Sequence, residues 1–108
     1  MAVGDVIAIT TIVSAANFRD YQPTAGVEVS VHSISYQLAG STFASWVSSG
    51  VIRCFHYDGS NPTFIDQDNA SGSMFFGSLE ITNANYLRFW NTDADENIQL
   101  TLKGRQTK

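Results

Sequence analysis

The residues Cys54, His56 and Asp58 stand two apart in the chain, and their types match a nucleophile, a base and an orienting acid. Alternate residues of a β-strand face the same side, so the three side chains would share one face. They would lie about 7 Å apart along the strand, which is beyond direct hydrogen-bond reach. The chain also has no G-x-S-x-G elbow, phosphate-binding loop or dinucleotide-binding fingerprint. We therefore expect no enzymatic activity, and a small hydrolase remains the alternative.

Zinc binding is the second chemistry that this segment suggests. Cys54 and His56, with His32 as a third ligand, could form an open zinc site. A single cysteine is more often a small buried apolar residue than a metal ligand. We therefore expect no zinc ion here.

Two acidic clusters are candidate calcium-binding sites. The clusters are Asp66, Asp68 and Asn69, and Asp93, Asp95 and Glu96. In the first cluster, Ala70 stands where a calcium loop has a third oxygen ligand, and Gly77 stands where it has the closing Glu. Asp and Asn also favour turns because their side chains bond their own backbone. We expect no cofactor or metal, and a calcium-stabilised adhesive domain remains an alternative.

Alternating apolar and polar residues predict β-strands along the chain, whereas helical periodicity is nearly absent. The expected strands cover residues 6–14, 27–36, 51–57, 63–66, 73–81, 86–91 and 97–103. The apolar phase shifts between Val31 and Ile34, which predicts a β-bulge near His32 and Ser33 or a strand that changes sheets. Seven or eight strands separated by turn signals predict an all-β fold, a single antiparallel β-sandwich of jelly-roll type.

Composition limits the classes of protein that this chain fits. Its 108 residues suit one domain, residues 1–108, and one cysteine allows no internal disulfide. The net charge of −4 argues against nucleic-acid binding, and no apolar run reaches the length of a membrane span. The N-terminal segment carries Asp5 and lacks a basic start, so we expect no signal peptide. The basic residues Lys103, Arg105 and Lys108 are expected to form a solvated tail.

The strand at residues 86–91 places large side chains on both of its faces. Leu87 and Phe89 occupy one face, while Tyr86, Arg88 and Trp90 occupy the other. If Leu87 and Phe89 enter the core, the other three form an exposed stripe of the residue types enriched at protein interfaces. We predict that this stripe is a subunit interface.

Further aromatic residues extend this prediction. Phe43 and Trp46 lie in an irregular segment, and we expect them to contribute to the interface. Exposed aromatic residues on β-sandwiches also stack on sugars, and Trp46, Tyr57, Tyr86 and Trp90 could serve that purpose. A carbohydrate- or receptor-binding module is therefore the main alternative.

From about residue 18 onward, the chain resembles small tailed-phage virion proteins built as β-sandwiches. The resemblance is carried by the order of DYQPTAGVE at 20–28, HSI at 32–34, YDGSN at 57–61, ITNANYLR at 81–88 and KGRQTK at 103–108. The insertion at residues 38–50 and the acidic turn at 93–96 depart from that pattern. The resemblance implies a structural role on a capsid or tail, as a symmetric oligomer.

Together these observations predict a bacteriophage capsid decoration or cement protein. We expect it in the virion after synthesis in the host cytoplasm, as a homotrimer whose partner is the major capsid protein or another virion protein. Neither nucleic acid nor a membrane is an expected partner. Residues 1–14 are a candidate docking strand, because an apolar β-branched run suits addition to a neighbour's sheet.

Overall fold

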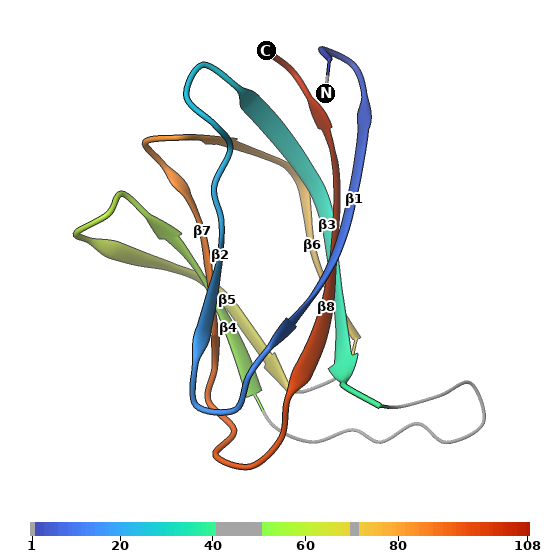
Figure 1. The fold of residues 1–108 in the computed structure, drawn as a ribbon, viewed down its shortest axis with the longest axis vertical. Coiled ribbons are helices and arrows are strands. Elements are labelled where there is room, and N and C mark those ends of the chain that lie inside the picture. The colour runs from blue at the N-terminus through green and yellow to red at the C-terminus, as the bar shows by residue number, and fades with distance from the viewer. Residues whose placement is uncertain (1, 41–50, 70–71) are drawn as a thin grey trace.

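The computed structural model describes residues 2–40, 51–69 and 72–108, and for residues 51, 68–69 and 72–77 it describes the backbone alone. These residues form eight β-strands (Figure 1). The strands are β1 (Val6–Val13), β2 (Phe18–Tyr21), β3 (Glu28–Leu38), β4 (Val51–Tyr57), β5 (Pro62–Asn69), β6 (Gly72–Thr82), β7 (Tyr86–Asn91) and β8 (Ile98–Gln106). The described part of the chain contains no helix that is long and apolar enough to cross a membrane.

The strands form two antiparallel sheets with the orders β1-β8-β3-β6 and β2-β7-β4-β5. Successive strands alternate between the two sheets, except for the β4–β5 hairpin. This order is that of a jelly roll, in which non-adjacent parts of the chain pair within each sheet. The predicted all-β sandwich is therefore confirmed, with eight strands.

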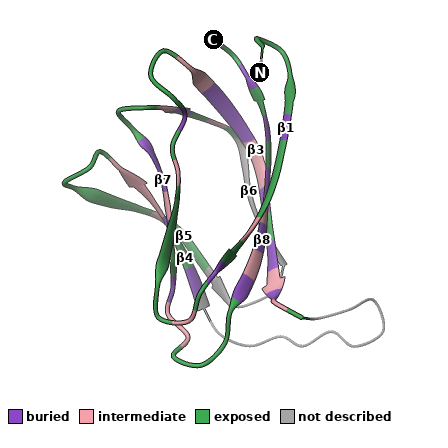
Figure 2. Ribbon diagram, in the orientation of Figure 1, coloured by how far each residue is buried: buried purple, intermediate pink, exposed green. Residues whose placement is uncertain are grey.

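The core lies between the two sheets, and Figure 2 shows the buried positions along their strands. Ile98, Leu100 and Leu102 of β8 face inward from one sheet, and Leu87 and Phe89 of β7 face inward from the other. All five are at most 1 % exposed. Leu87 and Phe89 are thus the β7 residues that enter the core, and Tyr86, Arg88 and Trp90 lie on the other face.

The predicted β-bulge is present in β3. The register with both neighbouring strands shifts between Val31 and Ser33, so β3 stays in its sheet with one additional residue. Gly104 of β8 pairs with Val31 beside this bulge. A Cβ at Gly104 would overlap the carbonyl oxygen of Ser30 and lie 3.0 Å from the Cα of Val31. Only glycine allows the two backbones to approach so closely.

Three features extend or correct what the sequence predicts. The sequence did not predict β2, whose four residues are too short for a clear pattern. Lys103, Arg105 and Lys108 are exposed as expected, but the chain is not a tail up to residue 106, because β8 continues to Gln106 and buries Gly104. The expected docking strand pairs with β8 of its own chain along its whole length, Val6 opposite Arg105 and Val13 opposite Ile98. Residues 6–13 are thus an edge strand of the sandwich, and addition of this strand to a neighbour's sheet stays a prediction.

Candidate functional site

The outer face of the β2-β7-β4-β5 sheet carries the predicted stripe. Tyr86, Arg88 and Trp90 of β7 alternate with the core residues and point outward. Trp90 is 36 % exposed, Arg88 is half-buried and Tyr86 is buried. Tyr57 packs edge-on against Tyr86, with ring centroids 5.6 Å apart, which explains the low exposure of Tyr86. Phe43 and Trp46, the other two predicted interface residues, lie outside the described residues.

Strand register places further side chains beside this stripe. On β2, Phe18 lies opposite Trp90 and Asp20 lies opposite Arg88. On β4, residues 53, 55 and 57 lie opposite Trp90, Arg88 and Tyr86. We call this surface the aromatic face, and it comprises Phe18, Asp20, Arg53, Phe55, Tyr57, Phe64, Tyr86, Arg88 and Trp90.

Arg88 holds the middle of the aromatic face in one arrangement. Its Nε donates to Asp20 Oδ1 at 2.7 Å and its Nη2 donates to Asp20 Oδ2 at 2.9 Å. The hydrogen bonds to Asp20 raise the pKa of Arg88 above its ordinary value. The guanidinium lies 3.8 Å from the ring centroid of Phe18 and 4.1 Å from that of Tyr57. A bidentate ion pair and two cation–π contacts therefore fix this side chain.

The stacking continues to Trp90. The rings of Phe18 and Trp90 lie 6.1 Å apart and within 18° of parallel. Trp90, Phe18, Arg88 and Tyr57 thus form one continuous stack across three strands. Such a stack is ordered before any partner arrives, so little side-chain entropy remains to be lost on binding.

A hollow of about 350 Å³ opens on the aromatic face. Its lining comprises Arg53, Phe55, Tyr57, Ser60, Pro62, Arg88 and Trp90. Arg53 of β4 donates from Nε to Oε1 of Gln67, its partner on β5, at 2.9 Å. Phe64, which is 56 % exposed, packs edge-on against Phe55 next to the hollow. The hollow therefore combines ring surfaces with cationic hydrogen-bond donors.

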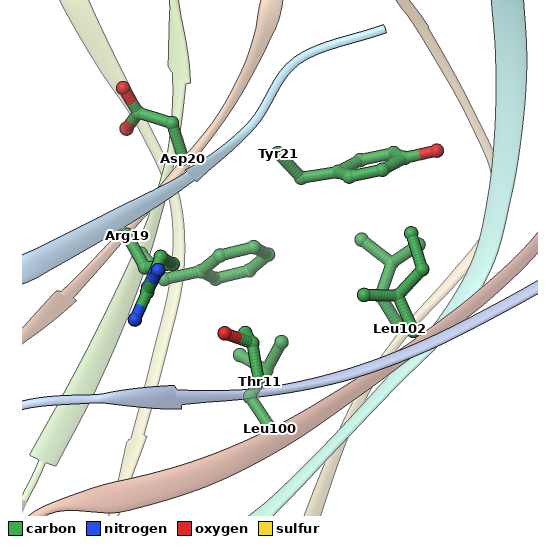
Figure 3. A pocket seen from close by; sticks show the side chains of 8 residues that line it. Thr11, Arg19, Asp20, Tyr21, Leu100 and Leu102 are labelled. Carbon is green, nitrogen blue, oxygen red and sulfur yellow. The ribbon is translucent and has the colours of Figure 1, made fainter.

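A smaller crevice of about 180 Å³ opens between β1 and β2, the edge strands of the two sheets. Its apolar floor includes the core residues Leu100 and Leu102, and the ring of Tyr21 extends above them, whereas Asp20 points away (Figure 3). Burial raises the pKa of Tyr21 above its ordinary value. Arg19 spans the gap by donating from Nη2 to the carbonyl of Ile12 at 3.2 Å. This crevice is a gap between sheet edges that Arg19 bridges.

Cys54, a candidate nucleophile and zinc ligand, and Asp58, the candidate orienting acid, lie in different environments. Cys54 is fully buried in the core, and burial raises the pKa of its thiol far above the ordinary value. Asp58 is exposed and accepts hydrogen bonds from the backbone N–H groups of Ser60 at 2.8 Å and Asn61 at 2.6 Å, which lower its pKa. The thiol is thus an apolar core group, and the carboxylate stabilises the β4–β5 turn.

The acidic clusters have structural roles as well. Asp66, Asp68 and Asn69 belong to β5, so this segment is a strand rather than a calcium loop. Asp93 accepts hydrogen bonds from the backbone N–H groups of Asp95 at 2.8 Å and Glu96 at 2.9 Å, as expected for an Asx turn. Among the described residues, no group of three His, Cys, Asp or Glu side chains is placed to hold a metal ion.

Sequence reasoning found the β7 stripe but missed most of its neighbours. Phe55 could have been found, since Arg53, Phe55 and Tyr57 alternate with apolar residues in the expected strand 51–57. Phe18 and Asp20 gave no such signal, because their role depends on the pairing of β2 with β7.

Comparisons with known proteins yield weak structural similarity alone. No protein-family model matches the chain, and no curated protein matches its sequence. The nucleoplasmin-like N-terminal domain of Drosophila FKBP39 is 7 % identical, with a TM-score of 0.48 over 93 % of this chain and 89 % of that one. The disulfide-linked pili of Bacillus endospore appendages are 16 % identical, with a TM-score of 0.47 over 95 % of this chain and 87 % of that one.

A third similar structure is the Yersinia pseudotuberculosis-derived mitogen, which is 7 % identical, with a TM-score of 0.42 over 95 % of this chain and 87 % of that one. Similarity at this level supports no functional conclusion, and the fold assignment rests on the strand order itself.

Proposed function

We propose that this protein is a structural component of a bacteriophage virion, a capsid decoration or cement protein that acts through protein–protein contacts of its sheets. The observation that carries the proposal is the aromatic face, where Trp90, Phe18, Arg88 and Tyr57 form one preordered stack on an outer surface. Trp, Tyr and Arg dominate the binding energy of protein interfaces when they become desolvated at the centre of a contact.

The chemistry of the other residues supports a structural role. The buried thiol of Cys54 and the turn-forming carboxylates of Asp58 and Asp93 are occupied by packing and hydrogen bonding. A decoration protein needs a stable fold and an adhesive surface, and many identical sites on a shell raise its local concentration. The resemblance to small virion proteins noted above agrees with this role.

The proposal is tested by mass spectrometry of purified phage particles from the host that carries the gene. We expect the chain as a stoichiometric particle component, and we expect Trp90→Ala to lower its occupancy on those particles. Lys103→Ala, a change at an exposed position on the opposite sheet, is the matched control and should leave occupancy unchanged. Particles that lack the chain would refute the proposal.

A carbohydrate-binding module of a phage tail or fibre is the second candidate. The hollow favours it, because Trp90 and Tyr57 line a space of about 350 Å³ that is large enough for a sugar ring. A sugar that stacks there should change the fluorescence of Trp90. Titration with host surface polysaccharide therefore separates the candidates: a saturable change that Trp90→Phe abolishes supports sugar binding over a protein interface.

A further inference from the structure

We infer that the hollow on the aromatic face receives the acidic turn of a second copy of this chain, residues 93–96, in a head-to-tail contact. The inference rests on the proposed function, since it names the partner of the same face.

The charge of the hollow indicates the chemistry of its partner. Arg53 and Arg88 line it, and its described lining includes no carboxylate, although the whole protein carries a net charge of −4. Arg88 is bonded to Asp20, whereas Arg53 makes its one hydrogen bond to described residues through Nε. The two terminal nitrogens of Arg53 make no hydrogen bond to the described residues, and such a pair of N–H groups can bind a carboxylate with two parallel hydrogen bonds.

The same charge argues against pairing two aromatic faces with each other. A symmetric face-to-face contact centred on the hollow would bring the two copies of Arg53 close together, whereas Arg88 is already paired with Asp20. Like charges that meet in an interface are destabilising. An acidic surface from another part of the molecule would instead place opposite charges in contact.

The turn between β7 and β8 has the required charge. Asp95 and Glu96 are exposed, and their carboxylates form no hydrogen bond or ion pair with the described residues. Asp93 holds the turn in shape through its two backbone hydrogen bonds, so the tip is preordered. The turn projects from the end of the sandwich opposite the two termini, where a neighbouring molecule can reach it (Figure 1).

The hollow and the turn also fit in size and environment. A volume of about 350 Å³ accommodates one or two side chains of the turn. The rings of Phe55, Tyr57 and Trp90 would shield the resulting ion pair from water, and a lower local dielectric strengthens it.

A contact between two different surfaces has a geometric consequence. Repeated head-to-tail addition closes into a ring if the rotation permits and otherwise grows into an open filament. A closed ring of three copies would be the trimer that the sequence analysis expects.

The test is sedimentation analysis of the purified chain in about 0.05 M and about 0.5 M NaCl, because surface ion pairs are screened by salt. We expect self-association that weakens at high salt. Arg53→Glu and Glu96→Arg should each weaken it roughly tenfold or more, since each places like charges in contact. Arg105→Glu and Glu80→Arg, exposed changes on the other sheet, are the matched controls and should leave it unchanged.

The decisive experiment is a reversal of both charges in one chain. The double variant Arg53→Glu with Glu96→Arg should regain association close to that of the unmodified chain, because opposite charges again meet. The double variant Arg53→Glu with Asp95→Arg is a second, independent charge reversal. A monomer at all concentrations, association insensitive to these changes, or single-variant losses that neither double variant restores would each overturn the inference.

The two proposals fail in distinguishable ways. If the reversal does not restore association but Trp90→Ala still lowers particle occupancy, the head-to-tail contact is wrong and the virion role stands. If the reversal works but the chain is absent from particles, the contact stands and the virion role is wrong.

Discussion

Arg88 shows how one side chain organises a surface. Its planar guanidinium bonds Asp20 through two nitrogens and also lies against the rings of Phe18 and Tyr57. A lysine could supply the charge but neither the fork nor the flat stacking surface. Exposed ion pairs contribute little to stability on their own, so the value of this pair lies in fixing the stack rather than in its energy.

Gly104 lies in close contact with the backbone of Ser30 and Val31. We expect Gly104→Ala to lower the free energy of unfolding by about 1–3 kcal/mol, because the added methyl group must displace the backbone at Ser30 and Val31. Urea denaturation followed by tryptophan fluorescence measures the change. Lys103→Ala, at the adjacent exposed position, is the control and should shift the free energy of unfolding by less than about 0.5 kcal/mol. An unchanged midpoint for Gly104→Ala would contradict the close approach.

The carboxylate of Asp93 makes the free energy of unfolding depend on pH. Its pKa is lowered in the folded state because the N–H groups of Asp95 and Glu96 bond the ionised carboxylate. The stabilisation is therefore complete above the unfolded pKa of about 3.9 and is lost as the pH falls through the lower folded pKa.

We expect the free energy of unfolding of Asp93→Asn to fall less steeply between about pH 5 and about pH 2 than that of the unmodified chain, because the amide keeps an acceptor oxygen but does not titrate. Urea denaturation across this range measures both slopes. Asp95→Asn removes a carboxylate that accepts no hydrogen bond from the described residues, and it should keep the original slope. Equal slopes for all three chains would exclude a role for the Asp93 carboxylate.

At the scale of elements, the residues that alternate most clearly were the easiest to predict. The expected strands at 51–57 and 86–91 coincide with β4 and β7, because each has a continuous apolar face that the core requires. The bulge in β3 was also visible, since one additional residue reverses the apolar phase.

The elements that sequence missed depend on pairing. β2 has four residues and is held by its register with β7, so its own residues carry too little pattern. The end of β8 was missed because Gly104 and Gln106 are unusual strand-core residues, and their burial follows from the approach of β3.

The same distinction between local pattern and strand pairing applies to the candidate site. Tyr86, Arg88 and Trp90 were predictable from the alternation of one strand, whereas the stack requires contacts between β2, β4 and β7. The Asp20–Arg88 pair joins residues 68 positions apart, and no local pattern reveals such a contact.

At the scale of the whole molecule, the jelly-roll order joins the two ends of the chain. β1 and β8 pair along the length of β1, and the N–H of Gly4 donates to the carbonyl of Gln106 at 2.7 Å. Both termini accordingly lie at one end of the sandwich (Figure 1). The acidic turn lies at the opposite end and the aromatic face on the side of the second sheet, so the two surfaces proposed to meet are free of the chain ends.

Deletion of residues 2–13 tests whether β1 belongs to the fold or serves as a docking strand. Ile7 and Val13 are buried, and burial of such side chains contributes about 1.5–3 kcal/mol each. Their loss, with that of the β1–β8 hydrogen bonds, approaches the 5–15 kcal/mol that holds a typical domain together. We therefore expect the shortened chain to be largely unfolded, as measured by circular dichroism and thermal denaturation.

Val6→Ser, a change at an outward position that is 66 % exposed, should retain the original melting temperature within a few degrees. A shortened chain that melts like the full one but no longer self-associates would show that residues 1–14 act as a docking strand.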